Sequence, residues 1–378
     1  MKLGLKILFL LVFLLALVVL TAASHRGVQA QSGATPKSVV MPIGKPIQIK
    51  APLGLPPVPI PSDNPPTEET IALGRRLYYD PRLSVDGTIS CASCHAPQFS
   101  FSDSRPVSAG VGGQLGKRHA PTVINSAYST LQFWDGRAPS LEEQAKGPMA
   151  NPVEMAHSLD GVVKRLQADA KYPALFKEAW GTDQITIDMV AKSIASFERT
   201  VIAGDSPFDR FYYGRDSKAL APEAQRGLRI FMSSKKGDCA ACHTIGKDSS
   251  LFTDNKFHNL GIGADTRGQL NDLGRYNETK VETDKGCFKT PSLRNLANRG
   301  PYMHDGSFPT VKDTLAHYIG GGNWNPYLDK EIHSLDVLTF DERDELLQFL
   351  DALNGKLPDN IGPPADLAAP AKTLTSRK

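Results

Sequence analysis

Apolar residues recur along this chain at the spacing that places them on one face of an α-helix. The clearest case follows Thr186 and ends at Gly204, and its apolar face would carry Ile187, Val190, Ile194, Phe197 and Val201. A threonine before such a series and a glycine after it are the usual start and stop signals of a helix. The pattern therefore predicts an amphipathic helix between these two residues.

Other helix starts carry equally clear signals. Thr67 precedes two glutamates, which suit the positive end of a helix dipole. The spacing of a capping box recurs twice, at Ser140 with Glu143 and at Thr339 with Glu342. Strand signals are few, so the sequence predicts a mainly α fold.

The first 30 residues have the parts of an export signal. Two lysines precede a long apolar run, and the segment ends in the small-residue sequence Val28-Gln29-Ala30. We expect cleavage after Ala30. An uncleaved membrane anchor through residues 7–23 is the alternative, because the run is nearly long enough to span a bilayer. In both cases the rest of the chain is expected in the periplasm.

Prolines crowd the next part of the chain, residues 31–66. Proline fixes the backbone angle φ and removes a hydrogen-bond donor, so this composition favours extended backbone over packed helix or sheet. We interpret the segment as a linker without chemistry of its own.

One short motif occurs twice and points to a cofactor. Cys91-Ala92-Ser93-Cys94-His95 recurs as Cys239-Ala240-Ala241-Cys242-His243. In C-x-x-C-H the two thiols can add to the two vinyl groups of one haem, and the histidine that follows is the proximal ligand of the iron. The sequence thus predicts two covalently bound c-type haems, with His95 and His243 as metal ligands.

Two other uses of C-x-x-C fit less well. Paired zinc knuckles usually enclose roughly 15 to 20 residues, whereas Cys94 and Cys239 are much further apart. A thioredoxin-like redox motif needs no histidine after each copy and lies in a βαβ setting that this chain lacks. Cys287 remains as the fifth cysteine, which argues against a disulfide scaffold, and we expect a small buried thiol.

Further motifs keep the same order in both halves, which predicts a duplicated unit. Residues 73–78 match 226–231, residues 121–125 match 291–295, and residues 133–136 match 303–306. We expect two cytochrome c-like domains, each with one haem. The expected limits are 67–215 for the N-terminal haem domain, 216–360 for the C-terminal haem domain and 361–378 for a flexible tail.

Charge excludes one class of partner. The formal net charge is +3. Lys2, Lys6 and Arg26 in the export signal account for all of it, and no basic stripe stands out elsewhere. We therefore expect no nucleic acid partner.

Four longer motifs give the chain a resemblance to a known family. They are Gln132-Phe133-Trp134-Asp135-Gly136-Arg137, Leu141-Glu142-Glu143-Gln144-Ala145-Lys146-Gly147-Pro148, Asn151-Pro152-Val153-Glu154-Met155 and Pro301-Tyr302-Met303-His304-Asp305-Gly306-Ser307. Over about residues 67 to 355 the sequence resembles the bacterial di-haem cytochrome c peroxidases, a family that includes the MauG-type enzymes.

The resemblance implies roles for particular residues. The first haem would be the peroxide site, with His95 proximal and with Glu154 and Gln144 on the other side of the haem. A carboxylate beside the iron can move the proton that heterolytic cleavage of the O–O bond requires. Trp134 would lie between the haems, where an oxidisable indole can pass electrons. A calcium ion between the domains, held largely by backbone carbonyls, is also implied.

One departure concerns the first haem. Many family peroxidases have a loop histidine that closes this haem in the resting enzyme, but the loop over residues 96–117 contains none. His119 is the nearby candidate, and we expect it to be structural. We therefore predict an open, high-spin first haem at rest, as in the MauG-type branch.

The second haem shows a matching departure. The family's distal methionine would fall fourteen residues after His304, and that position is Tyr318. MauG-type members resemble this chain in having a tyrosine there. His317 is the rival ligand. Neighbouring side chains on a helix point about 100° apart, so only one of the two can face the iron, and we favour Tyr318.

These expectations lead to three functional hypotheses. The first is a periplasmic di-haem peroxidase that reduces hydrogen peroxide with electrons from a small donor protein, a cytochrome c or a cupredoxin. The second is a MauG-like enzyme that oxidises side chains of a partner protein to mature its cofactor. The third is a di-haem electron carrier without catalysis, in which both irons have two protein ligands.

Overall fold

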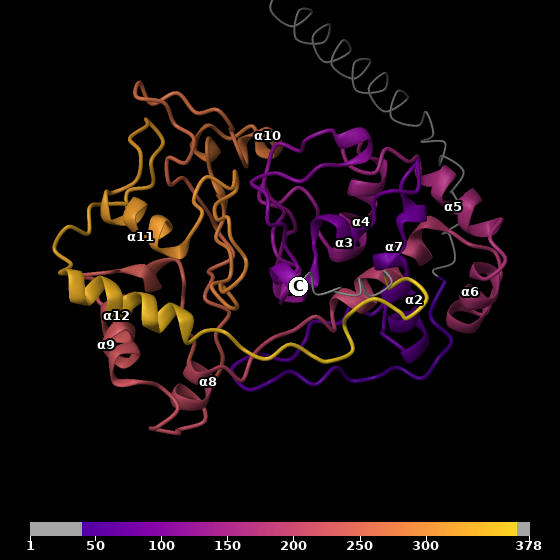
Figure 1. Cartoon of the computed structure of the whole chain (residues 1–378), viewed down its shortest axis with the longest axis horizontal. Helices are drawn as coiled ribbons and strands as arrows, with labels where there is room; N and C mark the ends of the chain where they lie inside the picture. Colours follow the sequence, from indigo (N-terminus) through magenta and orange to yellow (C-terminus); the bar gives the residue numbers. More distant parts are fainter. Residues whose placement is uncertain (1–39, 369–378) are drawn as a thin grey trace, which may run out of the picture. The chain divides into compact units, whose positions relative to one another are not determined.

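The computed structural model describes residues 40–368, which Figure 1 draws in colour. The predicted export signal, its cleavage point, the possible membrane anchor and the last ten residues of the tail lie outside the described part. None of the helices within residues 40–368 combines the length and the apolar character needed to cross a membrane.

The described chain is mainly helical, as the sequence predicts. Its α-helices are α2 (Glu68–Tyr79), α3 (Cys91–Cys94), α4 (Leu141–Ala150), α5 (Leu159–Gln167), α6 (Tyr172–Trp180), α7 (Ile187–Glu198), α8 (Pro207–Tyr212), α9 (Pro222–Met232), α10 (Tyr276–Thr279), α11 (Val311–Ile319) and α12 (Phe340–Asp351). Two strands, β1 (Phe257–His258) and β2 (Phe288–Lys289), pair antiparallel, with Phe257 opposite Lys289.

Helices α2 and α7 cross closely in the first half of the chain. Thr67 caps α2 as predicted, because its hydroxyl oxygen accepts a hydrogen bond of 3.2 Å from the backbone of Thr70. Gly74 makes the crossing possible: a Cβ there would lie 1.7 Å from the carbonyl oxygen of Ser193. Apolar side chains from both helices, such as Leu77 and Ile194, then fill the core.

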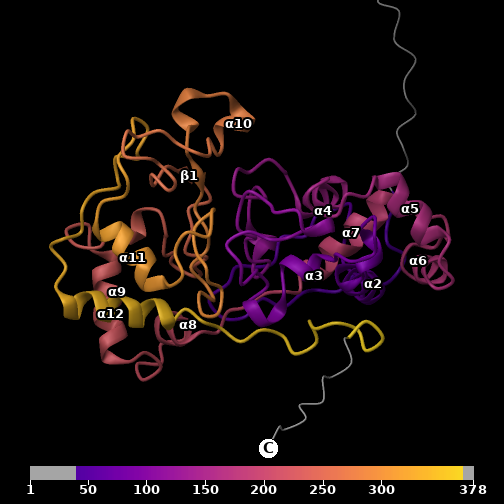
Figure 2. The same ribbon diagram turned by 45° about the horizontal axis from the view of Figure 1, so that its top comes forward.

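Helices α9 and α12 cross in the same way in the second half, and Figures 1 and 2 both draw α12 across α9. Gly227 has the role of Gly74, since a Cβ there would lie 2.0 Å from the carbonyl oxygen of Glu345. Phe231 and Phe349 pack with ring centroids 5.0 Å apart. Thr339 and Glu342 form the predicted capping box of α12.

The segments that match in sequence also match in local structure. Asn125 and Asn295 both have a positive φ, of 62° and 54°. The side-chain amide of Asn125 pairs with the backbone of Ala203, and that of Asn295 pairs with the backbone of Gly355. A left-handed asparagine that holds a distant backbone segment is a specific feature, and its occurrence in both halves supports the predicted repeat.

Helix α7 ends earlier than the apolar pattern predicts. It stops at Glu198, six residues before Gly204. Val201 accepts a backbone hydrogen bond from Asn125, and Ala203 pairs with the side chain of the same asparagine. These long-range bonds use backbone groups that a longer helix would need, so the predicted end of this helix was wrong.

The two halves are joined by a reciprocal pair of backbone hydrogen bonds. The N–H of His119 donates to the carbonyl of His304 over 2.7 Å, and the N–H of Lys289 donates to the carbonyl of Trp134 over 2.8 Å. In the matched motifs His119 is equivalent to Lys289, and Trp134 is equivalent to His304. Equivalent residues thus meet across the junction.

The proline-rich segment forms no helix or strand over its described residues 40–66, in keeping with its composition. It is nevertheless packed against the protein. Leu55 is buried, and the carbonyl of Gly54 accepts hydrogen bonds of 2.9 Å from the backbone of Ser250 and from the guanidinium of Arg294. The described part of this segment is therefore fixed to the second half, unlike a free linker.

The C-terminal segment returns to the first half after α12. Ile361 is buried in the same core as α2 and α7. Its carbonyl accepts a hydrogen bond of 2.7 Å from the Tyr79 hydroxyl, and Asp366 forms an ion pair of 2.7 Å with Arg76. Residues 361–368, which we expected to be flexible, are packed against α2.

Candidate functional site

The first C-x-x-C-H motif is built on a single helical turn. Cys91 and Cys94 are the ends of α3, and His95 follows as its C-cap, with its N–H 2.9 Å from the carbonyl of Cys91. The hydroxyl of Tyr78 on α2 donates a hydrogen bond of 2.9 Å to the carbonyl of His95. The motif is thus held against the core, with both thiols and the imidazole brought together in one turn.

The imidazole of His95 suits a metal ligand. Burial lowers its pKa, which favours the neutral ring that can bind a metal. Its Nδ1 is buried without a hydrogen-bond partner among the described residues. An unpaired buried nitrogen is rare in a folded protein, and here it belongs to the residue that the motif assigns to iron.

The second motif lies on a short 3₁₀ turn, Cys239–Ala241, followed by Cys242. Nδ1 of His243 lies 2.9 Å from the carbonyl oxygen of Phe252, so the N–H donates there and Nε2 remains for a metal. Burial lowers the pKa of His243 to about 4. This imidazole is therefore neutral and held in one tautomer.

A cavity of about 280 Å³ adjoins the second motif. Its lining includes Cys239, Cys242, His243 and Tyr318. Two cations also line it: burial lowers the pKa of Lys289 to about 8 and that of Arg299 to about 10. Both donate hydrogen bonds to backbone carbonyls, and neither forms an ion pair with a carboxylate of the described chain. The two propionates of a haem would supply the missing negative charge, so the residues around this cavity fit the group.

Tyr318 and His317 have different surroundings, although both lie on α11. Tyr318 lines the cavity, and its pKa is raised by burial and by the nearby Cys239 and Cys242. The His317 ring instead lies 2.9 Å, through Nε2, from the carbonyl oxygen of Leu260. Tyr318 is thus the side chain that borders the second motif.

Trp134 lies at the junction of the two halves. Its indole N–H donates a hydrogen bond of 2.8 Å to the carbonyl of His119, and its own carbonyl accepts from Lys289. It also lines the cavity beside the second motif. An aromatic side chain at this position contacts residues of both halves.

Glu154 lies close to the first motif. Burial is the main reason why the pKa of the Cys94 thiol is raised, and the carboxylates of Asp103 and Glu154 add to it. Burial also raises the pKa of Glu154, against a hydrogen bond of 2.7 Å from Asn151. Gln144 is half-buried on α4, and no hydrogen bond joins it to Glu154 within the described chain.

His119 is buried, and other groups occupy both of its ring nitrogens. Nδ1 lies 3.1 Å from the carbonyl oxygen of Arg105, and Nε2 lies 3.0 Å from the hydroxyl of Ser102. This is the environment of a structural histidine.

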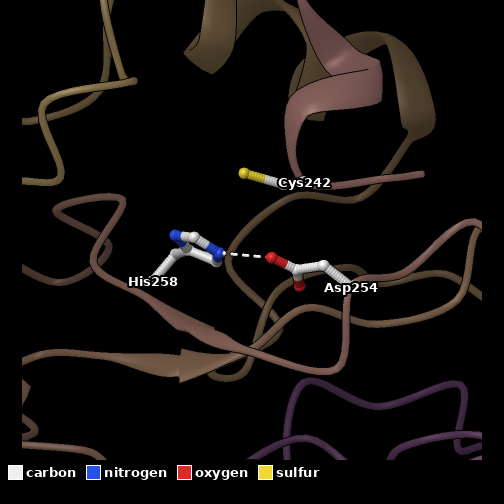
Figure 3. A group of neighbouring side chains, drawn as sticks. All are labelled: Cys242, Asp254 and His258. Carbon is white, nitrogen blue, oxygen red and sulfur yellow. Dashed lines mark hydrogen bonds and ion pairs between the residues drawn. The ribbon is translucent and has the colours of Figure 1, made fainter.

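A cluster that the sequence reasoning missed lies beside the second motif. The ring of His258 lies between two carboxylates, with Nε2 3.0 Å from Asp254 and Nδ1 2.5 Å from Asp329. Figure 3 shows the Cys242 side chain next to the same ring. The contact with Cys242 is the main reason why the pKa of His258 is raised to about 10, and the bonds to Asp254 and Asp329 add to it.

The sequence contained one local hint of this cluster, the spacing of four residues between Asp254 and His258, while Asp329 is distant in the chain. Cys242, Asp254 and His258 lie close enough to hold a metal ion. Cys242, however, is one of the two thiols of C-x-x-C-H, and a thioether to haem removes it as a thiolate ligand. We therefore treat the cluster as part of the second haem site.

Comparisons with known proteins agree with this geometry. Residues 68–217 match the family model described as di-haem cytochrome c peroxidase. The methylamine utilization protein MauG of Methylorubrum extorquens is 42% identical over 302 residues, which cover 79% of this chain and 82% of the relative. Cytochrome c peroxidase Ccp of Escherichia coli is 40% identical over 305 residues, which cover 79% of this chain and 60% of the relative.

A solved structure extends the match to three dimensions. The crystal structure of a MauG-like protein associated with microbial copper homeostasis has 32% sequence identity and a TM-score of 0.73, and it covers 84% of this chain and 96% of that chain. This chain therefore belongs to the family of di-haem cytochrome c peroxidases and MauG proteins, an oxidoreductase family whose name implies two c-type haems.

Proposed function

We propose that this enzyme reduces hydrogen peroxide at the haem held by Cys91, Cys94 and His95. The observation that carries the proposal is a difference between two equivalent helices. Tyr318 lies eight residues after the N-cap of α11, and the residue eight after the N-cap of α4 is Pro148. A proline side chain has no atom that can bind iron, so one haem would be open to peroxide and the other closed by a phenol.

The histidines support an open first haem. The loop over residues 96–117 contains none, and both ring nitrogens of His119 are engaged by Arg105 and Ser102. A haem iron with one free axial position can bind peroxide and receive electrons from a second haem. We also propose that the two halves are separate haem domains, which end at residues 215 and 360. They would have arisen by duplication.

Glu154 and Gln144 would handle the peroxide itself. The reduction of one hydrogen peroxide to two waters takes up two electrons and two protons. A carboxylate oxygen of Glu154 takes the proton from one peroxide oxygen and returns it to the other, which is general acid–base catalysis. Gln144 offers an amide that can hydrogen-bond peroxide without changing its protonation.

The electrons would enter at the second haem, held by Cys239, Cys242 and His243 with Tyr318 as the second axial ligand. Trp134 contacts both halves and provides an oxidisable side chain between them. The donor would be a small cytochrome c or cupredoxin in the periplasm. A calcium ion between the halves, bound by backbone carbonyls, completes the proposal.

Turnover is the direct test of this function. The full-length holoenzyme should consume hydrogen peroxide at a steady rate with a reduced small cytochrome c or cupredoxin as donor. If no small donor supports turnover while peroxide still reacts with the enzyme, the peroxidase assignment is wrong.

A MauG-like activity is the second candidate. The tyrosine at position 318 and the 42% identity to a MauG protein favour it. In that case a side chain of a partner protein would supply the two electrons in place of a donor protein. Oxidation of a partner protein by peroxide, with no turnover of small donors, would establish it.

A non-catalytic electron carrier is the third candidate. It requires a protein ligand on both sides of both irons. A ferric protein that binds neither cyanide nor peroxide would establish it, and the Glu154→Gln substitution would then change nothing.

A further inference from the structure

Glu198 is a buried acid that has no role in the proposed peroxide reaction, which uses Glu154 and Gln144. It is the last residue of α7, and only 5% of its surface is exposed. Its Oε2 is buried and finds no hydrogen-bond partner within residues 40–368. Burying an unpaired carboxylate is costly, so such groups are uncommon and call for a reason.

The internal repeat identifies what Glu198 faces. Gly74 contacts the backbone of Ser193, and the equivalent Gly227 contacts the backbone of Glu345. Glu198 lies five residues after Ser193, and Leu350 lies five residues after Glu345. Glu198 is therefore equivalent to Leu350. Leu350 lines the cavity beside the second motif, so Glu198 holds the position in the first half that borders the haem.

Electrostatics place the same carboxyl beside the first attachment cysteine. Burial raises the pKa of the Cys91 thiol, and the next largest cause is the charge of Glu198. The hydroxyl of Tyr78 donates to the carbonyl of His95. Burial raises the pKa of Tyr78, and the charges of Cys91 and Glu198 add to this effect. In the second half the residue equivalent to Tyr78 is Phe231, so the first half has two polar groups where the second has two apolar ones.

The charged groups around Glu198 leave it without a partner. Arg199, its neighbour in the chain, forms an ion pair of 2.8 Å with Glu142 on α4, and both side chains are largely buried. Glu142 also accepts a hydrogen bond of 2.7 Å from Asn64. The nearby cation is thus already neutralised. Burial raises the pKa of Glu198 to about 8, so its carboxyl keeps a proton at neutral pH.

A second cavity lies beside Arg199, the residue that follows this acid in the chain. It has a volume of about 300 Å³, and its other walls include Pro59, Pro61 and Gln132. The Nε of Arg199 is buried without a partner among the described residues, which is the setting in which ordered water is found. We take this cavity as the source of protons for Glu198.

We propose that Glu198 is a proton store of the first haem site, neutral in the resting protein and deprotonated while the site lacks electrons. Peroxide takes two electrons from the protein and two protons from solvent as it becomes two waters. The carboxyl of Glu198 then releases one proton to solvent, and the carboxylate formed offsets part of the positive charge that the site has gained. When electrons return from the donor, the carboxylate takes back one proton from solvent. The proposal rests on the assignment of a haem to His95 and its two cysteines.

Infrared difference spectroscopy of the full-length holoenzyme, reduced and reoxidised at an electrode, tests this directly. The wild-type protein should show a C=O band of a protonated carboxylic acid that changes with the oxidation state and shifts in D₂O. Glu198→Gln should lose the band. Glu143→Gln, an exposed carboxyl on α4, should keep it. Absence of the band from the wild type, or its persistence in Glu198→Gln, would overturn the proposal.

A second variant guards against misfolding. Glu198→Leu introduces the residue found at the equivalent position of the second half, where an apolar side chain packs well. It should also lose the band, and it should lower kcat for peroxide by at least about tenfold with little change in KM. Because the electrode supplies the electrons, the infrared result does not depend on which donor or substrate the enzyme uses. A failed peroxidase assay and a failed proton store are therefore distinguishable.

Discussion

His317 and Tyr318 are neighbours on one helix, and their side chains have separate roles. The ring of His317 is engaged by the carbonyl of Leu260, while Tyr318 borders the cavity of the second motif. The sequence could predict that only one of them faces this site, because the helical period separates their directions. It could not predict the position of Leu260, on which the answer depends.

Removal of the Tyr318 hydroxyl should change the second iron alone. Low-temperature EPR of the resting ferric protein is expected to contain one high-spin and one low-spin signal. Tyr318→Phe should lose the low-spin signal, because a phenyl ring cannot ligate iron, and His317→Phe should retain it. Two low-spin signals in the wild type would mean that another residue, with His119 as the first candidate, closes the first haem.

Glu154 should give the peroxide reaction a dependence on pH. The carboxylate form accepts the proton, and burial raises its pKa above the ordinary value for glutamate. The rate with peroxide should therefore fall as the pH drops through that raised pKa. Glu154→Gln should remove this dependence and slow the reaction by roughly 10²- to 10⁴-fold.

Stopped-flow mixing with peroxide across a range of pH measures both effects. Glu178→Gln, an exposed carboxyl on α6, serves as the control and should behave like the wild type. A variant at position 154 with the wild-type pH profile would remove Glu154 from the chemistry.

At the scale of elements, local signals predicted where helices begin better than where they end. The caps at Thr67, Thr186 and Thr339 are all present, because a hydroxyl that accepts from its own helix is a local interaction. Helix α7 stops early because Asn125, far away in the chain, binds the backbone that follows it. No pattern within the helix could have revealed that competitor.

One buried ion pair joins several of these elements. The guanidinium of Arg294 binds both carboxylate oxygens of Asp209 on α8 over 2.8 Å, and also the carbonyls of Gly54 and Ser250. Both charged side chains are at most 1% exposed. Arg294→Leu should therefore destabilise the protein by about 3 to 5 kcal/mol, since it leaves Asp209 buried and unpaired.

Chemical denaturation of the holoprotein measures this loss. The matched control is Arg267→Leu, which breaks an exposed pair with Asp265 and should cost at most about 1 kcal/mol. Equal effects of the two substitutions would show that burial does not govern the contribution of the Arg294 pair.

At the scale of the whole molecule, the matching motifs of the two halves were visible in the sequence, but the contacts between the halves were not. The similarity of the motifs around Trp134 and His304 can be seen in the sequence alone. Their reciprocal bonds with Lys289 and His119 depend on how the halves meet. The return of residues 361–368 to α2 was likewise hidden, because a short segment with two consecutive prolines carries no helical or strand period.

Loss of this returning segment should weaken the first half. A chain that ends at Pro358 lacks the buried Ile361 and its hydrogen bond from Tyr79. We expect a loss of about 2 to 4 kcal/mol from the buried side chain and the Tyr79 hydrogen bond, to which the contacts of Arg75 and Arg76 near the surface add little. Thermal unfolding measures it, with a chain that ends at Ala368 as control. Equal melting temperatures would contradict the expectation.

The position of Ile361 also sets the order in which the protein can be completed. A chain is made from its N-terminus, so α2 and the first C-x-x-C-H motif exist long before residue 361 is synthesised. Until then the core between α2 and α7 lacks one of its apolar side chains. The unit that is made first is therefore the last to be closed.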